Sequence, residues 1–121
     1  MGTSYFDNYF QTITNRLSDI ATNTLLEGVG LIKDAREAGA KVILAGNGGS
    51  AAMASHVTVD LVKCANVHAI NFNEADLITC FANDYGYAHW VEEALKVYGA
   101  ASDLAILISS SGQSENMLNA A

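Results

Sequence analysis

The chain contains no proline, only two cysteines and only six lysines and arginines among its 121 residues. A chain without proline and with few turn clusters is neither a linker nor a disordered tail. Thirteen acidic residues bring the net charge to −7, which excludes the basic face that neutralises nucleic-acid phosphates or anionic lipid. We therefore expect neither nucleic acid nor a membrane among its partners.

Targeting signals and cysteine-based metal or redox motifs are also missing. No apolar run approaches the about 18 residues of a membrane-spanning helix, and the first residues lack a signal-peptide pattern. Cys64 and Cys80 do not have the spacing of a metal or redox motif. These absences predict a cytoplasmic protein with free thiols. We expect both cysteines, together with His68 and His89, to be packing residues.

Short apolar runs rich in branched residues predict three buried strands, at residues 41–45, 66–71 and 104–108. Amphipathic spacing and capping residues predict helices at residues 4–17, 22–37, 50–63, 77–81 (after an N-cap at 73–76), 88–98 and from 113 onward. Residues 83–87 have the composition of a loop. Because strands alternate with helices, the fold class is α/β, with a parallel sheet covered on both faces.

The order of elements predicts one domain, residues 1–121, in which two N-terminal helices (1–39) precede an αβ core (40–121). Half of the residues are apolar, enough for a core. Three strands are few for such a sheet. We therefore expect the sequence to be the N-terminal part of a longer protein, with the end of the fold missing. The alternative is a short domain completed by a partner chain.

Each N-terminal helix carries an apolar stripe. The stripe of the first helix is largely aromatic, and we expect it to pack against another subunit: Tyr5, Tyr9, Phe10, Ile13 and Leu17. The second helix should turn its stripe inward: Leu25, Leu26, Val29, Leu31 and Ile32.

Two turns rich in glycine and serine, Gly46–Ser50 and Ser109–Ser114, each follow a predicted strand and precede a predicted helix. Parallel strands would bring both turns to one edge, where helix N-termini, glycine backbone and hydroxyl groups favour an anion. Neither turn matches the dinucleotide or P-loop fingerprint. The pattern predicts a site for the phosphate of a small phosphomonoester; the alternative is a pair of ordinary turns with N-capping serines.

Two pairs of polar residues could add chemistry to this site. His56 and Asp60 share one helix face, about 5–6 Å apart, so they could bind one metal ion or pass a proton. An ordinary surface contact is the alternative. Asn83 and Asp84 lie in the predicted loop, where these residue types also favour plain turns.

Three segments, Gly46–Ser50, Ala82–Tyr87 and Ile108–Asn116, occur in an order that resembles the sugar isomerase (SIS) domain family, and specifically its sedoheptulose-7-phosphate isomerase branch. The resemblance covers nearly the whole chain. It implies a flavodoxin-like, three-layer αβα sandwich with a five-stranded parallel sheet, of which this chain would supply the first three strands. It also implies a homotetramer with active sites between subunits.

The resemblance assigns roles to residues that match the family motifs. The implied substrate-binding residues are Asn47, Gly48, Gly49, Ser50, Asn83, Asp84, Ser109, Ser110, Ser111 and Ser114. His56 and Asp60 match two zinc ligands of the family, the second of which is Glu in its isomerases and also acts as an acid/base. Asp60 is one methylene shorter. The family's other two ligands, Gln and His, lie on a C-terminal helix beyond residue 121.

The implied activity is an aldose–ketose isomerase that converts sedoheptulose 7-phosphate into D-glycero-D-manno-heptose 7-phosphate for a surface polysaccharide such as lipopolysaccharide or capsule. The 121 residues alone are expected to be inactive. The alternative is a non-catalytic SIS module that binds a phosphosugar or docks a protein, such as a replication initiator. Asp60 in place of Glu favours the binding module, whereas the coexistence of His56, Asp60, Asn83 and Asp84 favours the enzyme.

Overall fold

The computed structural model describes residues 3–121. Residues 1 and 2, which the predicted N-terminal segment includes, lie outside the described residues. The chain divides into two compact units, one ending at Leu31 and the other spanning Ile32–Ala121. Helices α1 (Thr3–Ser18) and α2 (Thr22–Glu37) confirm the two predicted N-terminal helices, and α2 runs across the boundary between the units.

The N-terminal unit exposes both of its apolar stripes. On α1 the side chains of Tyr5, Tyr9, Phe10, Ile13 and Leu17 are between 41% and 65% exposed. On α2 the prediction that the stripe points inward is wrong for Leu25, Leu26, Val29 and Leu31, which are all exposed. The exposure of both stripes means that α1 and α2 do not bury them against each other. Of the five residues of the α2 stripe, only Ile32, which belongs to the second unit, packs against a core.

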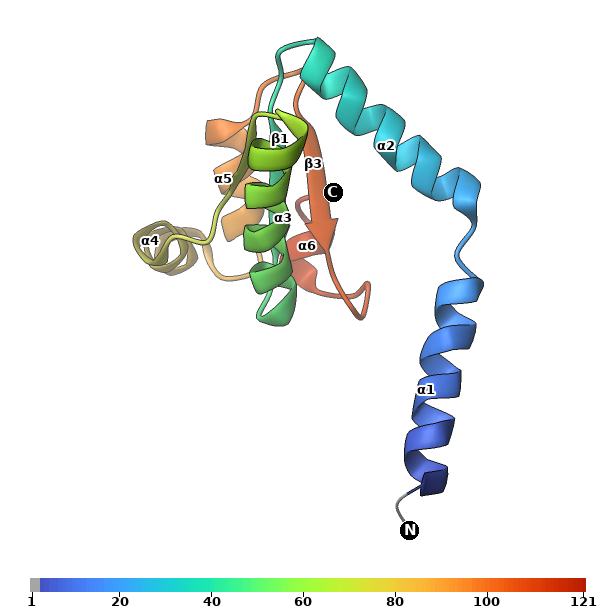
Figure 1. Cartoon of the computed structure of the whole chain (residues 1–121). Coiled ribbons are helices and arrows are strands. Elements are labelled where there is room, and N and C mark those ends of the chain that lie inside the picture. The colour runs from blue at the N-terminus through green and yellow to red at the C-terminus, as the bar shows by residue number, and fades with distance from the viewer. Residues whose placement is uncertain (1–2) are drawn as a thin grey trace. The chain divides into compact units, whose positions relative to one another are not determined.

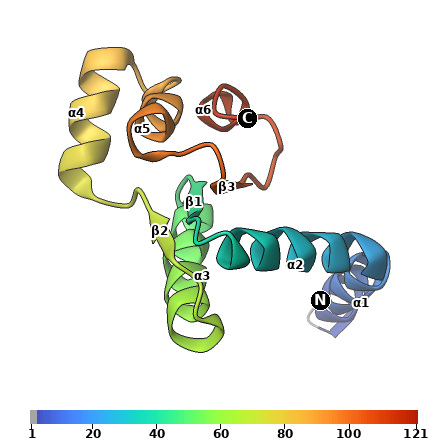
Figure 2. The ribbon, with the colours of Figure 1, turned by 90° about the horizontal axis from the view of Figure 1, so that it is seen from above.

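The second unit contains a parallel sheet with the order β2-β1-β3. Strands β1 and β3 are labelled in Figure 1, and all three strands in Figure 2. Strands β1 (Val42–Gly46) and β3 (Leu104–Ile108) confirm two predicted strands. Strand β2 is shorter than predicted, Ala69–Asn71, because the helix before it ends late: Asn66 takes a left-handed conformation (φ 51°) as its C-cap. His68 precedes the strand and is exposed, so its predicted packing role is wrong.

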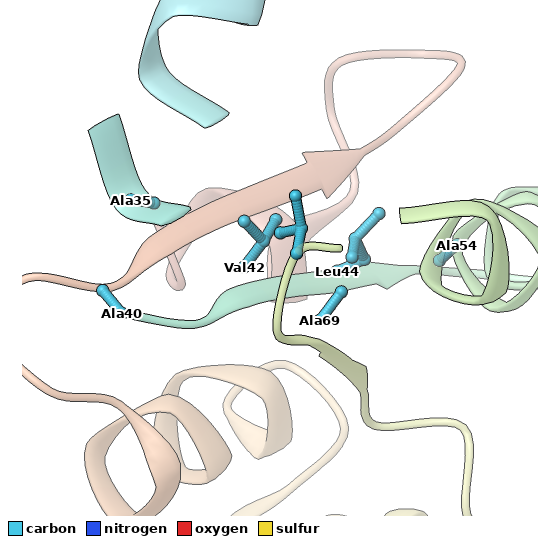
Figure 3. Packing of buried hydrophobic residues seen from close by; sticks show 7 residues of the cluster. Ala35, Ala40, Val42, Leu44, Ala54 and Ala69 are labelled. Atoms are coloured by element: carbon cyan, nitrogen blue, oxygen red, sulfur yellow. The ribbon is translucent and has the colours of Figure 1, made fainter. Parts of the chain in front are cut away.

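Helices cover both faces of the sheet. Figure 2 shows β1 between α3 (Gly49–Ala65) on one side and α5 (Trp90–Tyr98) and α6 (Glu115–Leu118) on the other. Alternate side chains of β1 enter two cores. Val42 and Leu44 pack near Ala54 of α3 (Figure 3), whereas the other core contains Ile43, Ala45, Trp90, Val91, Ala94 and Met117. This period of two produces the expected three-layer αβα arrangement.

Several predicted packing residues are instead on the surface. Cys64 and Cys80 are exposed free thiols, because they occupy outward faces of α3 and of α4 (Ala75–Tyr85). His89, at the N-cap of α5, is also exposed, with Nδ1 3.0 Å from Glu92. Hydrogen bonds, the stronger from Lys96 and the weaker from His89, hold the pKa of Glu92 below its ordinary value.

No helix among residues 3–121 is both long and apolar enough to cross a membrane.

Asp103 fastens β1 to β3 at the end of the sheet where both strands begin. Its carboxylate accepts hydrogen bonds from the backbone N–H of Lys41 at 2.7 Å and of Ala100 at 2.8 Å, and from the Lys41 ammonium. Leu104 N donates to Lys41 O at 2.9 Å beside it. The hydrogen bonds from Lys41 lower the pKa of Asp103 from 3.8 to about 2. The carboxylate is therefore more stable in the folded chain than in the unfolded one.

We predict that Asp103→Asn lowers the free energy of unfolding at pH 7 by about 2 kcal/mol, the value to which the pKa difference corresponds. A lowered pKa contributes stability above the ordinary pKa, and this contribution disappears as the pH falls toward 2. The difference between wild type and variant should therefore shrink between about pH 4 and pH 2, as measured by chemical denaturation.

The matched control is Asp34→Asn, which changes an exposed carboxylate of α2. It should leave the free energy of unfolding within about 0.5 kcal/mol of wild type. Equal effects of the two substitutions, or an Asp103→Asn effect that is as large at pH 2 as at pH 7, would contradict this account.

Candidate functional site

The first turn is held tightly against the start of α3. Strand β1 ends at Gly46, and Ser50 N donates to Asn47 O at 3.0 Å within the first turn of the helix. A Cβ atom on Gly46 would lie 2.8 Å from the backbone and the Cβ of Ser50, so this close approach requires glycine. Gly48 adopts a positive φ of 55°, which glycine also favours. The glycines therefore shape the turn that the sequence predicts as an anion site.

The second turn gathers three serine hydroxyls. The Oγ of Ser109 lies 3.1 Å from the Oγ of Ser114 and 3.5 Å from the Oγ of Ser111, which accepts a hydrogen bond from Gln113 N at 3.1 Å. Gly112 turns the chain with a φ of 64°. Helix α6 has only four residues rather than the longer helix expected from residue 113. Any anion here would be held mainly by hydroxyl groups, because so short a helix has little macrodipole.

A pair of asparagine side chains joins the first turn to α6, the helix that directly follows the second turn. Asn47 Nδ2 donates to Asn116 Oδ1 at 2.8 Å, and Asn116 Nδ2 donates to Asn47 Oδ1 at 2.9 Å. The Tyr87 hydroxyl also donates to Asn47 Oδ1, at 3.0 Å. Figure 1 shows α6 and the first turn of α3 beyond the same end of the sheet. The structure therefore brings both predicted turns together at one edge, with Tyr87 from the segment between α4 and α5.

Sequence reasoning assigned no role to Asn116 or Tyr87, although both lie in the segments that carry the family resemblance. The only signal in the sequence was the position of Asn116 next to the apolar Met117. The structure buries both residues, at 3% and 4% exposure. An amide at a buried position needs hydrogen-bond partners. The partner, Asn47, is 69 residues away, and only the strand pairing reveals it.

Asn83 and Asp84 lie in the last turn of α4 rather than in a loop. Glu74 caps the start of this helix through Asp76 N and Leu77 N, and the helix continues past the turn-forming residues until Gly86 ends it. Asn83 Nδ2 donates to Asp84 Oδ1 at 2.9 Å, and both side chains are exposed. The predicted loop is therefore wrong for residues 83–85, because helix propagation from a good cap overrode local turn preference.

His56 and Asp60 share one face of α3, as the i,i+4 spacing predicts. His56 Nε2 lies 3.6 Å from Asp60 Oδ2, and the side chains are 80% and 56% exposed. Two ligands of one tetrahedral zinc ion lie about 3.4 Å apart, so the pair fits one edge of such a site. Within residues 3–121 no group of three or more His, Cys, Asp and Glu side chains could hold a metal ion. The described residues therefore provide two ligands at most.

The SIS domain family model matches residues 5–121, so the chain belongs to this family. Among its relatives are proteins named phosphoheptose isomerase. The one from Cytophaga hutchinsonii is 33% identical over 103 residues, which are 81% of this chain and 54% of the relative. The one from Sulfurimonas denitrificans is 40% identical over 86 residues, which are 66% of this chain and 44% of the relative.

Two solved structures have the same arrangement. Phosphoheptose isomerase from Neisseria gonorrhoeae aligns with a TM-score of 0.86 and 25% identity over 97% of this chain and 64% of the other. The structure from Francisella tularensis aligns with a TM-score of 0.89 and 26% identity over 99% and 66%. The chain spans about half the length of the curated relatives that it matches. The resemblance found in the sequence motifs is thus confirmed for family and fold.

We predict that Gly46→Ala destabilises the chain by about 1–3 kcal/mol, because the added methyl would overlap Ser50 backbone that cannot move without shifting α3. The matched control is Gly49→Ala, where an added Cβ would meet nothing within 4 Å. Thermal or chemical denaturation measures both. If the two variants are equally stable, the close approach of Gly46 to Ser50 does not require glycine, and this account of the turn is wrong.

Proposed function

We propose that the protein to which this chain belongs acts as a phosphoheptose isomerase, which converts sedoheptulose 7-phosphate into D-glycero-D-manno-heptose 7-phosphate for surface polysaccharide synthesis. Membership of the SIS family and the names of the relatives support this proposal. The observation that carries it is the cluster of serine hydroxyls at 3.1–3.5 Å in the second turn, joined to the first turn through Asn47 and Asn116.

The two turns suit a phosphate monoester. Ser109, Ser111 and Ser114 can turn their hydroxyl groups toward the phosphate oxygens as neutral donors. Helix α3 has 17 residues, so its first turn offers the sugar oxygens Ser50 and backbone N–H groups at the positive end of a full macrodipole. A Cβ added to Gly48 or Gly49 would meet nothing within 4 Å, which leaves room for a ligand beside the backbone. Ser110, Asn83 and Asp84 are proposed as further substrate contacts.

The isomerisation moves one proton between neighbouring carbons. A base removes the proton from C1 of the ketose, an enediol forms, and the proton returns to C2 while the O1 hydroxyl proton passes to O2. We assign the acid/base role to Asp60, with His56 beside it at 3.6 Å. Anchoring the phosphate in the serine turn and the sugar at the first turn would hold the sugar carbons in one geometry through each turnover.

His56 and Asp60 are also proposed as the two ligands that this chain contributes to a zinc ion. Their separation of 3.6 Å supports the proposal. A bound zinc ion would act as a Lewis acid on the substrate oxygens.

The proposed assembly is a homotetramer in the cytoplasm. The exposed aromatic stripe of α1 supports association, since an apolar face of this kind is stable only when it is covered. The free and exposed thiols of Cys64 and Cys80 suit a reducing compartment.

The double variant Ser111→Ala with Ser114→Ala should weaken binding of sedoheptulose 7-phosphate at least about tenfold, because two hydroxyl donors to the phosphate are removed. Isothermal titration calorimetry measures the affinity. The control is Ser102→Ala, an exposed serine at the opposite end of β3, which should bind as wild type does. Unchanged binding in the double variant would place the phosphate elsewhere.

Asp60→Asn should abolish turnover in the full-length protein while phosphate binding stays nearly intact, because the change removes a charge and a base without altering size. Asp60→Glu keeps the carboxylate and gives it the longer side chain of the glutamate that the resemblance implies for the family's isomerases. This variant should remain active. His56→Ala should lose turnover and also lower the zinc content measured by elemental analysis. Wild-type turnover by Asp60→Asn would overturn the acid/base assignment and favour a binding module.

A further inference from the structure

Asn116 is a buried amide with both polar atoms satisfied by a single partner. Its side chain belongs to a residue that is 3% exposed, and its Oδ1 and Nδ2 pair with the amide of Asn47 at 2.8 and 2.9 Å. A buried amide without partners costs free energy. The reciprocal pair removes that cost only when the two amides lie in one relative orientation. The pair therefore fixes the geometry of both side chains.

The Tyr87 hydroxyl is a second hydrogen-bond partner of the Asn47 side chain. It donates to Asn47 Oδ1 at 3.0 Å, so this oxygen accepts two hydrogen bonds and both of its lone pairs are engaged. Of the Nδ2 group, one N–H is directed at Asn116. In this arrangement Asn47 can offer a ligand its second N–H but no acceptor. A ligand oxygen, rather than a ligand hydroxyl proton, is what this side chain can recognise.

The pair is not needed merely to attach α6 to the rest of the unit. Met117 is 4% exposed and packs in the core with Ile43 and Trp90. Asn119 Nδ2 also donates to Ala88 O at 2.9 Å, which ties the end of α6 to the chain before α5. Helix α6 thus has two further anchors, whereas Asn116 provides the side-chain contact to the first turn.

We propose that Asn116 is a positioning residue: through Asn47 it holds the first turn and the serine turn at a fixed spacing, so that one phosphosugar contacts both. The inference rests on the proposed function. It assigns the serine turn to the phosphate and the Asn47 N–H to an oxygen of the sugar. Loss of Asn116 should then weaken binding of a sugar phosphate much more than binding of inorganic phosphate, which needs only the serine turn.

The test compares Asn116→Leu, which fills a similar volume without an amide, with Asn116→Ala and with the control Asn119→Ala on the same short helix. Affinities of the 121-residue chain for sedoheptulose 7-phosphate and for inorganic phosphate are measured by calorimetry. Both Asn116 variants should lose about tenfold in affinity for the sugar phosphate and at most about twofold for inorganic phosphate. Asn119→Ala should match wild type with both ligands.

A second measurement does not depend on any ligand. In the free chain, Asn116→Leu should shift the backbone amide resonances of both turns, residues 47–50 and 109–114, whereas Asn119→Ala should leave residues 47–50 unshifted. Unchanged affinity for sedoheptulose 7-phosphate, or an equal loss for both ligands, would overturn the positioning role while leaving the proposed function intact. A wild-type chain that binds neither ligand would overturn the proposed function and this role together.

Discussion

The parallel pairing of β1 with β3 is the constraint on which the candidate site depends. Gly46 pairs with Ile108 in the register of these strands, so Asn47 and Ser109 are the next residues of two chains that leave the sheet side by side. Both turns therefore begin at the same point of the same edge. Asp103 secures this register at the opposite end, where its carboxylate accepts from Lys41. A shift of one residue would separate the turns.

The sheet was predictable because its strands are short, apolar and branched, and because α/β alternation permits few topologies. The ends of helices and strands were harder to predict where two local preferences compete. Residues 83–85 favour turns, yet the cap at Glu74 and the stop at Gly86 make them helical. Residues 66–68 resemble the start of β2, but Asn66 ends α3 there. The stripe of α2 is exposed because burial depends on what covers a helix, which a single sequence does not specify.

The same limit applies to the site. The two turns, and the helix face that His56 and Asp60 share, follow from local spacing. They could therefore be predicted from the sequence. The amide pair does not, because Asn47 and Asn116 are distant in the chain and meet only when β1 and β3 pair. With a net charge of −7 and serines as donors, the site relies on neutral hydroxyl and amide groups. Neutral groups bind a phosphosugar only when their hydrogen-bond geometry is good, because they add no net charge. The affinity should therefore depend more on the fixed spacing of the turns than it would with lysines.

The central claim is that the two turns form one phosphosugar site, and titration of the isotope-labelled chain with sedoheptulose 7-phosphate, followed by backbone amide resonances, tests it most directly. The account predicts that residues 47–50 and 109–114 shift together and give one dissociation constant. Shifts confined to one of the turns, or centred on another part of the chain, would contradict it.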